Sequence, residues 1–241
     1  MRVDEVTCTG CGECLPYCPV GAIDMIDGIA AADQDECVEC GVCTRVFSCP
    51  SDSMIQLSAE ELGFPRSLRR YFSDPIAVSP VTMGAGRGTE ECKTNDRTGR
   101  VKKGQAGFGI ELGRPGVSTS FVDVEKVTKK VASIGVEFEQ RNPIWPHLKD
   151  PGTGELKDEI KGERVLSLVV EFVTALDKTP QVMQALKELE QEVDTVFTVA
   201  VMCRVNEDKS VPVLPILQQM GLSPRPNAKI NVGLGRPLAN D

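Results

Sequence analysis

Two cysteine-rich stretches decide how this chain folds: residues 8–19 read CTGCGECLPYCP and residues 37–50 read CVECGVCTRVFSCP. In each stretch, three cysteines stand two residues apart and a further cysteine comes directly before a proline. The first three cysteines of the stretches are offset by 29 residues, and Gly12 and Gly41 are in step with that offset. The stretches are therefore an internal repeat, which predicts two similar sites built from duplicated sequence.

Metal ligation is the interpretation that best fits so many cysteines. The chain has 10 cysteines in 241 residues, and no apolar stretch precedes the first of them. A signal peptide is therefore not expected, and in the cytoplasm, where we expect this chain, thiols stay reduced. Disulfides and zinc are the alternatives. Zinc sites usually take two separated Cys-x2-Cys pairs rather than a three-plus-one set.

The spacing predicts cubic iron–sulfur clusters. Three thiolates two residues apart let a tight loop wrap one cluster, but the same loop cannot supply the fourth ligand. The cysteine before proline is then expected to ligate the other cluster. We expect two [4Fe–4S] clusters, one on Cys8, Cys11, Cys14 and Cys49 and the other on Cys37, Cys40, Cys43 and Cys18.

On these motifs, residues 1–57 resemble the bacterial dicluster ferredoxins. The resemblance implies a small fold with pseudo-twofold symmetry, two hairpins and short helices, whose adjacent clusters exchange electrons. A dicluster ferredoxin followed by an α/β domain is also similar to proteins of anaerobes. One departure is the segment before Cys49, residues 44–48, which has five residues where the family usually has three. The two clusters could therefore differ in reduction potential.

The negative charge of the chain belongs to the cysteine-rich segment. The formal net charge is −8, and residues 1–60 contain eleven acidic and two basic residues, so the remainder sums to +1. An acidic surface steers toward a redox partner protein with a basic docking surface and argues against nucleic acid. No apolar run is long enough for a membrane span.

The rest of the chain predicts an α/β domain. Helices are expected over 120–134, from Thr179 to about Val193, and over 210–220, with strands over 107–112, 136–139, 164–174, 195–204 and 228–234; residues 141–157 are expected to be irregular. This order indicates a split βαβ sandwich, so the fold class is α+β. We divide the chain into a ferredoxin domain (1–57), a linker with a basic glycine-rich loop (58–104) and the sandwich (105–241).

Several cations outside the cysteine repeat could bind a partner or ligand. Arg66, Arg69 and Arg70 either dock on the acidic ferredoxin domain or form a solvated helix face. The sequence Gly-Arg-Pro occurs after two of the expected strands and contains Arg114 in one copy and Arg236 in the other. With Arg87 of the glycine-rich loop, these two arginines are predicted to form an anion site; simple turns with exposed arginines are the alternative.

Other chemistry is scarce in the sequence. Cys92 and Cys203 stand outside the repeat and are expected to be idle or buried thiols. We expect an electron carrier or an electron-transfer subunit, whose C-terminal domain docks it to a larger redox enzyme or holds an oligomer. Two alternatives stay open. One is a single-chain reductase with an anionic substrate, and the other is a redox-linked small-molecule sensor. The sequence therefore does not establish whether the chain is an enzyme.

Overall fold

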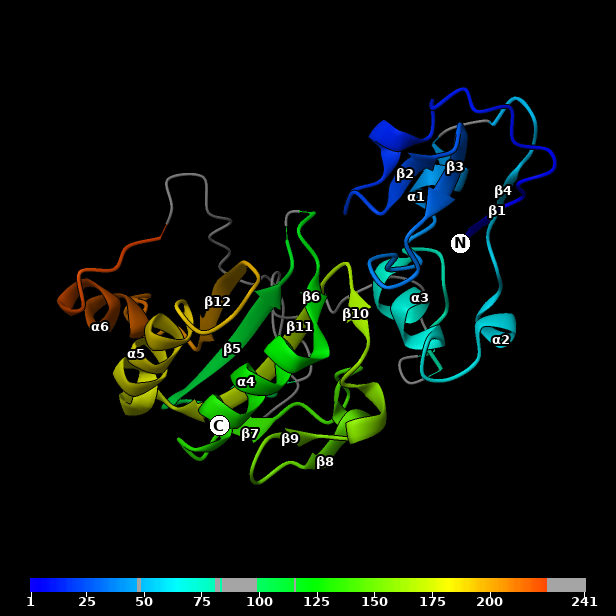
Figure 1. Cartoon of the computed structure of the whole chain (residues 1–241). Coiled ribbons are helices and arrows are strands. Elements are labelled where there is room, and N and C mark those ends of the chain that lie inside the picture. The colour runs from blue at the N-terminus through cyan, green and yellow to red at the C-terminus, as the bar shows by residue number, and fades with distance from the viewer. Residues whose placement is uncertain (47–48, 81–82, 84–98, 115, 225–241) are drawn as a thin grey trace.

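The cysteine repeat folds around two antiparallel strand pairs (Figure 1). The computed structural model describes residues 1–46, 49–80, 83, 99–114 and 116–224. Strand β1 (Arg2–Val3) pairs with β4 (Met54–Ile55), which ties the start of the chain to the end of the repeat. Strand β2 (Ile23–Ile26) pairs with β3 (Ile29–Ala32) through a turn at Asp27 and Gly28. Both turn residues have positive φ, as a two-residue hairpin turn requires.

Two short helices flank or contain cysteines of this unit. Helix η1 (Leu15–Tyr17) follows Cys14 and ends at Cys18, and α1 (Val42–Arg45) contains Cys43. Gly41 precedes α1 with a φ of 64°. The left-handed conformation of Gly41 suits glycine because it has no Cβ.

Two further helices connect the repeat to the rest of the chain. Helix α2 (Ala59–Leu62) begins at Ser58, whose hydroxyl accepts from the Glu61 N–H at 3.2 Å while the Glu61 carboxylate accepts from the Ser58 N–H at 2.7 Å. A Ser-x-x-Glu sequence favours this reciprocal cap. Helix α3 (Ser67–Ser73) then lies between the cysteine-rich unit and β10 (Arg164–Val165) (Figure 1).

A four-stranded antiparallel sheet forms the centre of the C-terminal unit. Its strand order is β12-β5-β11-β7. The central strand β5 pairs over its whole length with β11, and Phe108 faces Phe172 in that register. The bounds are β5 (Gln105–Leu112), β7 (Glu137–Phe138), β11 (Leu168–Ala175) and β12 (Phe197–Cys203).

Helices α4 (Phe121–Ala132) and α5 (Thr179–Leu189) cover one face of this sheet (Figure 1). Val124, Val127 and Val131 of α4 are fully buried, as the predicted apolar stripe requires. They pack in one cluster with alternate residues of the strands. The remaining elements are β6 (Thr119–Ser120), η2 (Trp145–His147), β8 (Leu148–Asp150), β9 (Glu155–Leu156), η3 (Asp158–Ile160), η4 (Leu176–Lys178) and α6 (Val213–Gln219).

The structure departs from the sequence expectation at three places. The strand expected over 164–174 is broken, because the Leu166 N–H donates to the Ser73 hydroxyl at 2.8 Å instead of to a neighbouring strand. Residues 141–157, for which the sequence predicts irregular structure, contain the β8–β9 hairpin, which turns at Gly154 with a φ of 73°. The last helix begins at Val213 rather than Ser210. The strand expected over 228–234 lies outside the described residues. Within the described ranges, no helix has the length and apolar character that crossing a bilayer requires.

Candidate metal centres

The second set of cysteines lines one cavity of the N-terminal unit. Cys37, Cys40 and Cys43 contribute to its wall, and Cys18 reaches the same cavity from the end of η1. Pro19, which follows Cys18, also lines it. The fold therefore brings the Cys-Pro cysteine of the first stretch to the three closely spaced cysteines of the second.

The first set of cysteines is gathered in a corresponding way. Burial raises the pKa of the Cys14 thiol, and negative charge on Cys11, Cys8 and Cys49 raises that pKa further. The four thiols therefore lie within electrostatic reach of one another. Cys49 thus lies near Cys8, Cys11 and Cys14, and Cys18 lies near Cys37, Cys40 and Cys43.

Two serine hydroxyls distinguish the first group. The Cys49 sulfur lies 3.2 Å from the Ser53 hydroxyl and 3.5 Å from the Ser51 hydroxyl. Hydrogen bonds from these hydroxyls lower the pKa of Cys49 to about 7, and backbone N–H groups lower the pKa of Cys8. Donors at these positions favour the thiolate form, which is the form that ligates metal. The sequence reasoning missed this pair, although two serines closely following Cys-Pro are visible in it.

The second group lies in a less polar setting. Burial and then negative charge on Cys40, Cys37 and Cys18 raise the pKa of Cys43 to about 12. Burial also raises the pKa of Cys40. Thiolates in such a place need positive charge close by, and a metal centre supplies it.

The spacing of these side chains differs from that of a site for one ion. Among the described residues, no three or more His, Cys, Asp or Glu side chains converge tightly enough to hold a single metal ion. A zinc ion requires ligand atoms within about 2.3 Å of one centre, whereas a cubic cluster spaces its four thiolates around a larger body.

Arginines hold the backbone of the second cysteine loop. The Arg69 guanidinium donates to the carbonyl of Cys37 at 2.8 Å and to the carbonyl of Asp35 at 2.9 Å, and that of Arg45 donates to the Cys40 carbonyl at 2.5 Å. Arg45 also pairs with the buried Asp74 at 2.9 Å. These contacts fix carbonyls that would otherwise lack partners next to the thiols.

A buried carboxylate of the second cysteine loop also pairs with an arginine. Glu39 is 1% exposed and pairs with Arg66 at 2.7 Å and with the amino group of Met1. The docking alternative for the arginines of α3 is therefore confirmed for Arg66 and Arg69. Arg70 also contacts the ferredoxin domain, because its guanidinium donates to the carbonyl of Leu57, and it pairs with Asp74 at 3.4 Å.

Of the other predicted residues, the structure describes Arg114 and Cys203. Arg114 donates to the Ser167 hydroxyl at 3.2 Å and lies 3.5 Å from the Glu111 carboxylate. Its proposed companions, Arg87 and Arg236, lie outside the described residues, so the anion site stays a prediction. Cys203 is half-buried in β12, and burial raises its pKa. Cys92 lies outside the described residues.

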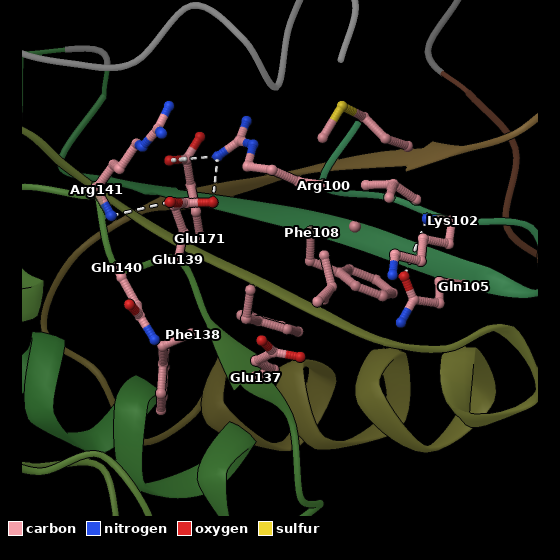
Figure 2. Close-up of a pocket in the computed structure, with 15 residues that line it drawn as sticks. Arg100, Lys102, Gln105, Phe108, Glu137, Phe138, Glu139, Gln140, Arg141 and Glu171 are labelled. Carbon is pink, nitrogen blue, oxygen red and sulfur yellow. Dashed lines mark hydrogen bonds and ion pairs between the residues drawn. The ribbon is translucent and has the colours of Figure 1, made fainter. Parts of the chain in front are cut away.

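A cavity of about 440 Å³ lies against the sheet of the C-terminal unit, and the sequence reasoning did not predict it. Figure 2 shows Arg100 reaching Glu139 and Glu171, at 2.8 and 3.9 Å. Gly107 and Glu171 line it from positions that alternate with the buried Phe108 and Phe172. These two lining residues therefore face away from α4 and α5. A glutamate within an apolar strand sequence is the signal that could have indicated this site.

Comparison with known proteins agrees with the geometry of the N-terminal unit. Residues 1–24 match the family described as the 4Fe-4S binding domain. The chain is 42% identical over 59 residues to a ferredoxin-like protein in the vnf region of Azotobacter chroococcum mcd 1, an alignment that covers 23% of this chain and 91% of that protein. It is 42% identical over 40 residues to Ferredoxin-1 of Rhodobacter capsulatus, covering 17% of this chain and 62% of that protein.

A longer relative shares only part of its length with the chain. One component of an ion-translocating oxidoreductase complex from Methanosarcina acetivorans is 40% identical over 52 residues, which is 22% of this chain and 19% of that component. No solved structure matches the chain significantly. The chain therefore belongs to the ferredoxins, as an iron–sulfur electron-transfer protein whose N-terminal 4Fe-4S domain is joined to a larger unit of mixed helix and sheet.

Proposed function

We propose that the chain holds two [4Fe–4S] clusters and passes single electrons between them and a partner. The observation that carries this proposal is the grouping of eight cysteines into two sets of four across the repeat. The ligands would be Cys8, Cys11, Cys14 and Cys49 for the first cluster and Cys37, Cys40, Cys43 and Cys18 for the second.

The residues around each set supply complementary functions. A bound [4Fe–4S] cluster supplies one-electron chemistry, which no protein side chain described above provides. The Ser51 and Ser53 hydroxyls would donate to ligand sulfur in the first set, and Arg45 and Arg69 hold the loop of the second. Hydrogen bonds and burial of this kind set the reduction potential of a cluster.

The C-terminal unit would serve to dock the ferredoxin domain to its redox enzyme. We take the domains as 1–57, the linker 58–104, and a split βαβ sandwich over 105–241. The strand order β12-β5-β11-β7, with α4 and α5 on one face, supports that topology. The acidic N-terminal segment supports a partner with a basic surface. A cytoplasmic location and assembly into an oligomer remain predictions.

The test is a reductive titration of anaerobically purified protein with matched cysteine variants. The wild type and Cys203→Ser should take up about two electrons per chain. Cys18→Ser should impair the second cluster and Cys49→Ser the first, although each serine replaces a cysteine of the opposite stretch. Uptake that is unchanged in both Cys18→Ser and Cys49→Ser would contradict the crossed ligand sets.

The cavity on the sheet favours a second candidate function, in which the C-terminal unit binds a small molecule as a reductase or a sensor. Arg100, Lys102 and Arg141 bring positive charge to its wall beside three glutamates. Its size suits a metabolite-sized ligand. Thermal shifts with a panel of carboxylates and phosphates test this function, and an Arg141→Gln variant that keeps the same shifts would contradict it.

A further inference from the structure

The two cysteine loops of the repeat differ in exposure although their cysteines share one spacing. In the first loop Cys11 is exposed, Cys8 is half-buried and Cys14 is buried, whereas Cys37, Cys40 and Cys43 of the second loop are all buried. Two of the positions between the cysteines differ in the same way, being polar in the first loop and apolar in the second. Thr9 and Glu13 of the first loop are exposed and polar, and at the same offset the second loop has Val38 and Val42.

A segment of the C-terminal unit covers the second loop. Leu166, at the break between β10 and β11, forms a buried cluster with Val38 and Cys40, and Val42 packs against it. This contact explains why the second loop is apolar, because polar side chains under Leu166 would lose their contact with water.

Ion pairs close the same interface. Arg69, itself 5% exposed, bonds the Cys37 carbonyl and pairs with Glu163 just before β10. Arg164 pairs with Glu36, which directly precedes Cys37. Glu36 and Glu39 of the second loop are thus already paired with arginines of the same chain.

Among the described residues, the buried cluster around the first loop contains no side chain of the C-terminal unit. Val6, two residues before Cys8, is 94% exposed, and Glu5 and Glu13 are exposed on either side of it. Within the part of the chain that the structure describes, neither glutamate forms an ion pair. An exposed thiol with an apolar spot and unneutralised acidic residues is the kind of surface that a basic protein recognises.

We propose that the C-terminal unit is docked on the second cysteine loop of the same chain, so that the first loop is the face at which an outside electron-transfer protein with a basic surface docks. This inference rests on the proposed pair of clusters and assigns each of them a neighbour. Electrons would enter or leave the chain beside Cys11, and the second cluster would lie against the chain's own Leu166.

The test uses the full-length, cluster-loaded protein and cytochrome c as a basic electron acceptor. Chains are reduced anaerobically and freed of reductant, and the second-order rate of cytochrome c reduction is measured against salt concentration. Glu5→Lys/Glu13→Lys should slow this reaction at least about tenfold at low salt and flatten its salt dependence. The control Asp35→Lys/Glu159→Lys makes the same change in net charge beside the second loop and on the C-terminal unit, and it should change the rate by less than about threefold.

A second measurement tests the covered loop. In hydrogen exchange followed by mass spectrometry, Leu166→Ala should speed exchange of residues 37–43 at least about tenfold and leave residues 8–14 unchanged. The control is Met183→Ala, because Met183 lies in α5 and packs against the C-terminal core; this variant should change neither loop.

Equal slowing by both charge variants would overturn the proposal, because total charge and not the first loop would then control the reaction. Exchange of residues 37–43 that does not respond to Leu166→Ala would also overturn it. A preparation without reducible clusters is distinguishable from both results, because no variant would then reduce cytochrome c. That outcome would overturn the proposed function and this inference together.

Discussion

The buried guanidinium of Arg69 should hold the second cysteine loop to the rest of the chain. Its Nη1 donates to the carbonyls of Gln34, Asp35 and Cys37 at 3.0, 2.9 and 2.8 Å, and its Nε pairs with Glu163. The side chains of Arg69 and Glu163 are 6% and 13% exposed. Arg69→Gln would leave a largely buried carboxylate without its cation.

The expected cost is about 3 to 5 kcal/mol, the range measured when one partner of a buried ion pair is removed. That is a large part of the 5 to 15 kcal/mol by which domains are typically stable. If this loss of stability is confined to the loop, the amides of residues 34–40 should exchange with solvent about a hundredfold faster or more. The estimate follows because each 1.4 kcal/mol or so changes the opening equilibrium by about a factor of ten.

Hydrogen exchange of the holoprotein, followed by mass spectrometry, measures this effect directly. Arg204→Gln is the control, because it removes an arginine that donates to the Val101 carbonyl within the C-terminal unit and not to the loop. Adding Glu163→Gln to Arg69→Gln should cost less than the sum of the two single changes. The reasoning would be refuted by exchange over 34–40 that changes less than about threefold, or by effects that simply add.

Three further predictions follow from other parts of the structure. Burial, with a smaller effect of Lys157, lowers the pKa of His147 to about 4. The unfolded chain has a histidine pKa near 6.5 and therefore binds the proton at a higher pH than the folded chain. The stability of the fold should then fall as the pH drops below about 6.5. This loss should be about 2 kcal/mol between pH 7 and pH 5, and His147→Gln should remove most of it in thermal unfolding at the two pH values. Ser53→Ala removes a hydroxyl that donates to ligand sulfur and favours the more negative reduced state, so the first-cluster potential should fall by about 20 to 60 mV in a redox titration, with the second unchanged. Gly113 has a φ of 82°, and a Cβ there would lie 2.6 Å from the Leu166 carbonyl oxygen; Gly113→Ala should lower the melting temperature by about 4 to 8 °C, and an unchanged value would contradict this close approach.

The local elements could be predicted because their signals are short-range. The valine stripe of α4 and the reciprocal Ser58–Glu61 cap each lie within one or two helical turns of sequence. The 4Fe-4S domain was also predictable, because the cysteine spacing and the offset of 29 residues are visible in the sequence.

The contacts between the two units could not be predicted in the same way. Arg69 and Glu163 are 94 residues apart in the chain, and no local pattern links them. The break in the strand at Leu166 has the same cause, since its partner is the hydroxyl of Ser73 on another element. The cavity on the sheet depends on Arg100 and Glu171 meeting across strands that only the folded chain aligns.

Metal analysis of protein purified without oxygen tests the central claim most directly. If the two sets of four cysteines each hold a [4Fe–4S] cluster, the chain should contain about eight iron atoms and about eight sulfides, and reduction should produce paramagnetic clusters visible by electron paramagnetic resonance. A chain that contains zinc in place of iron, or about four irons at most, would contradict the two-cluster account.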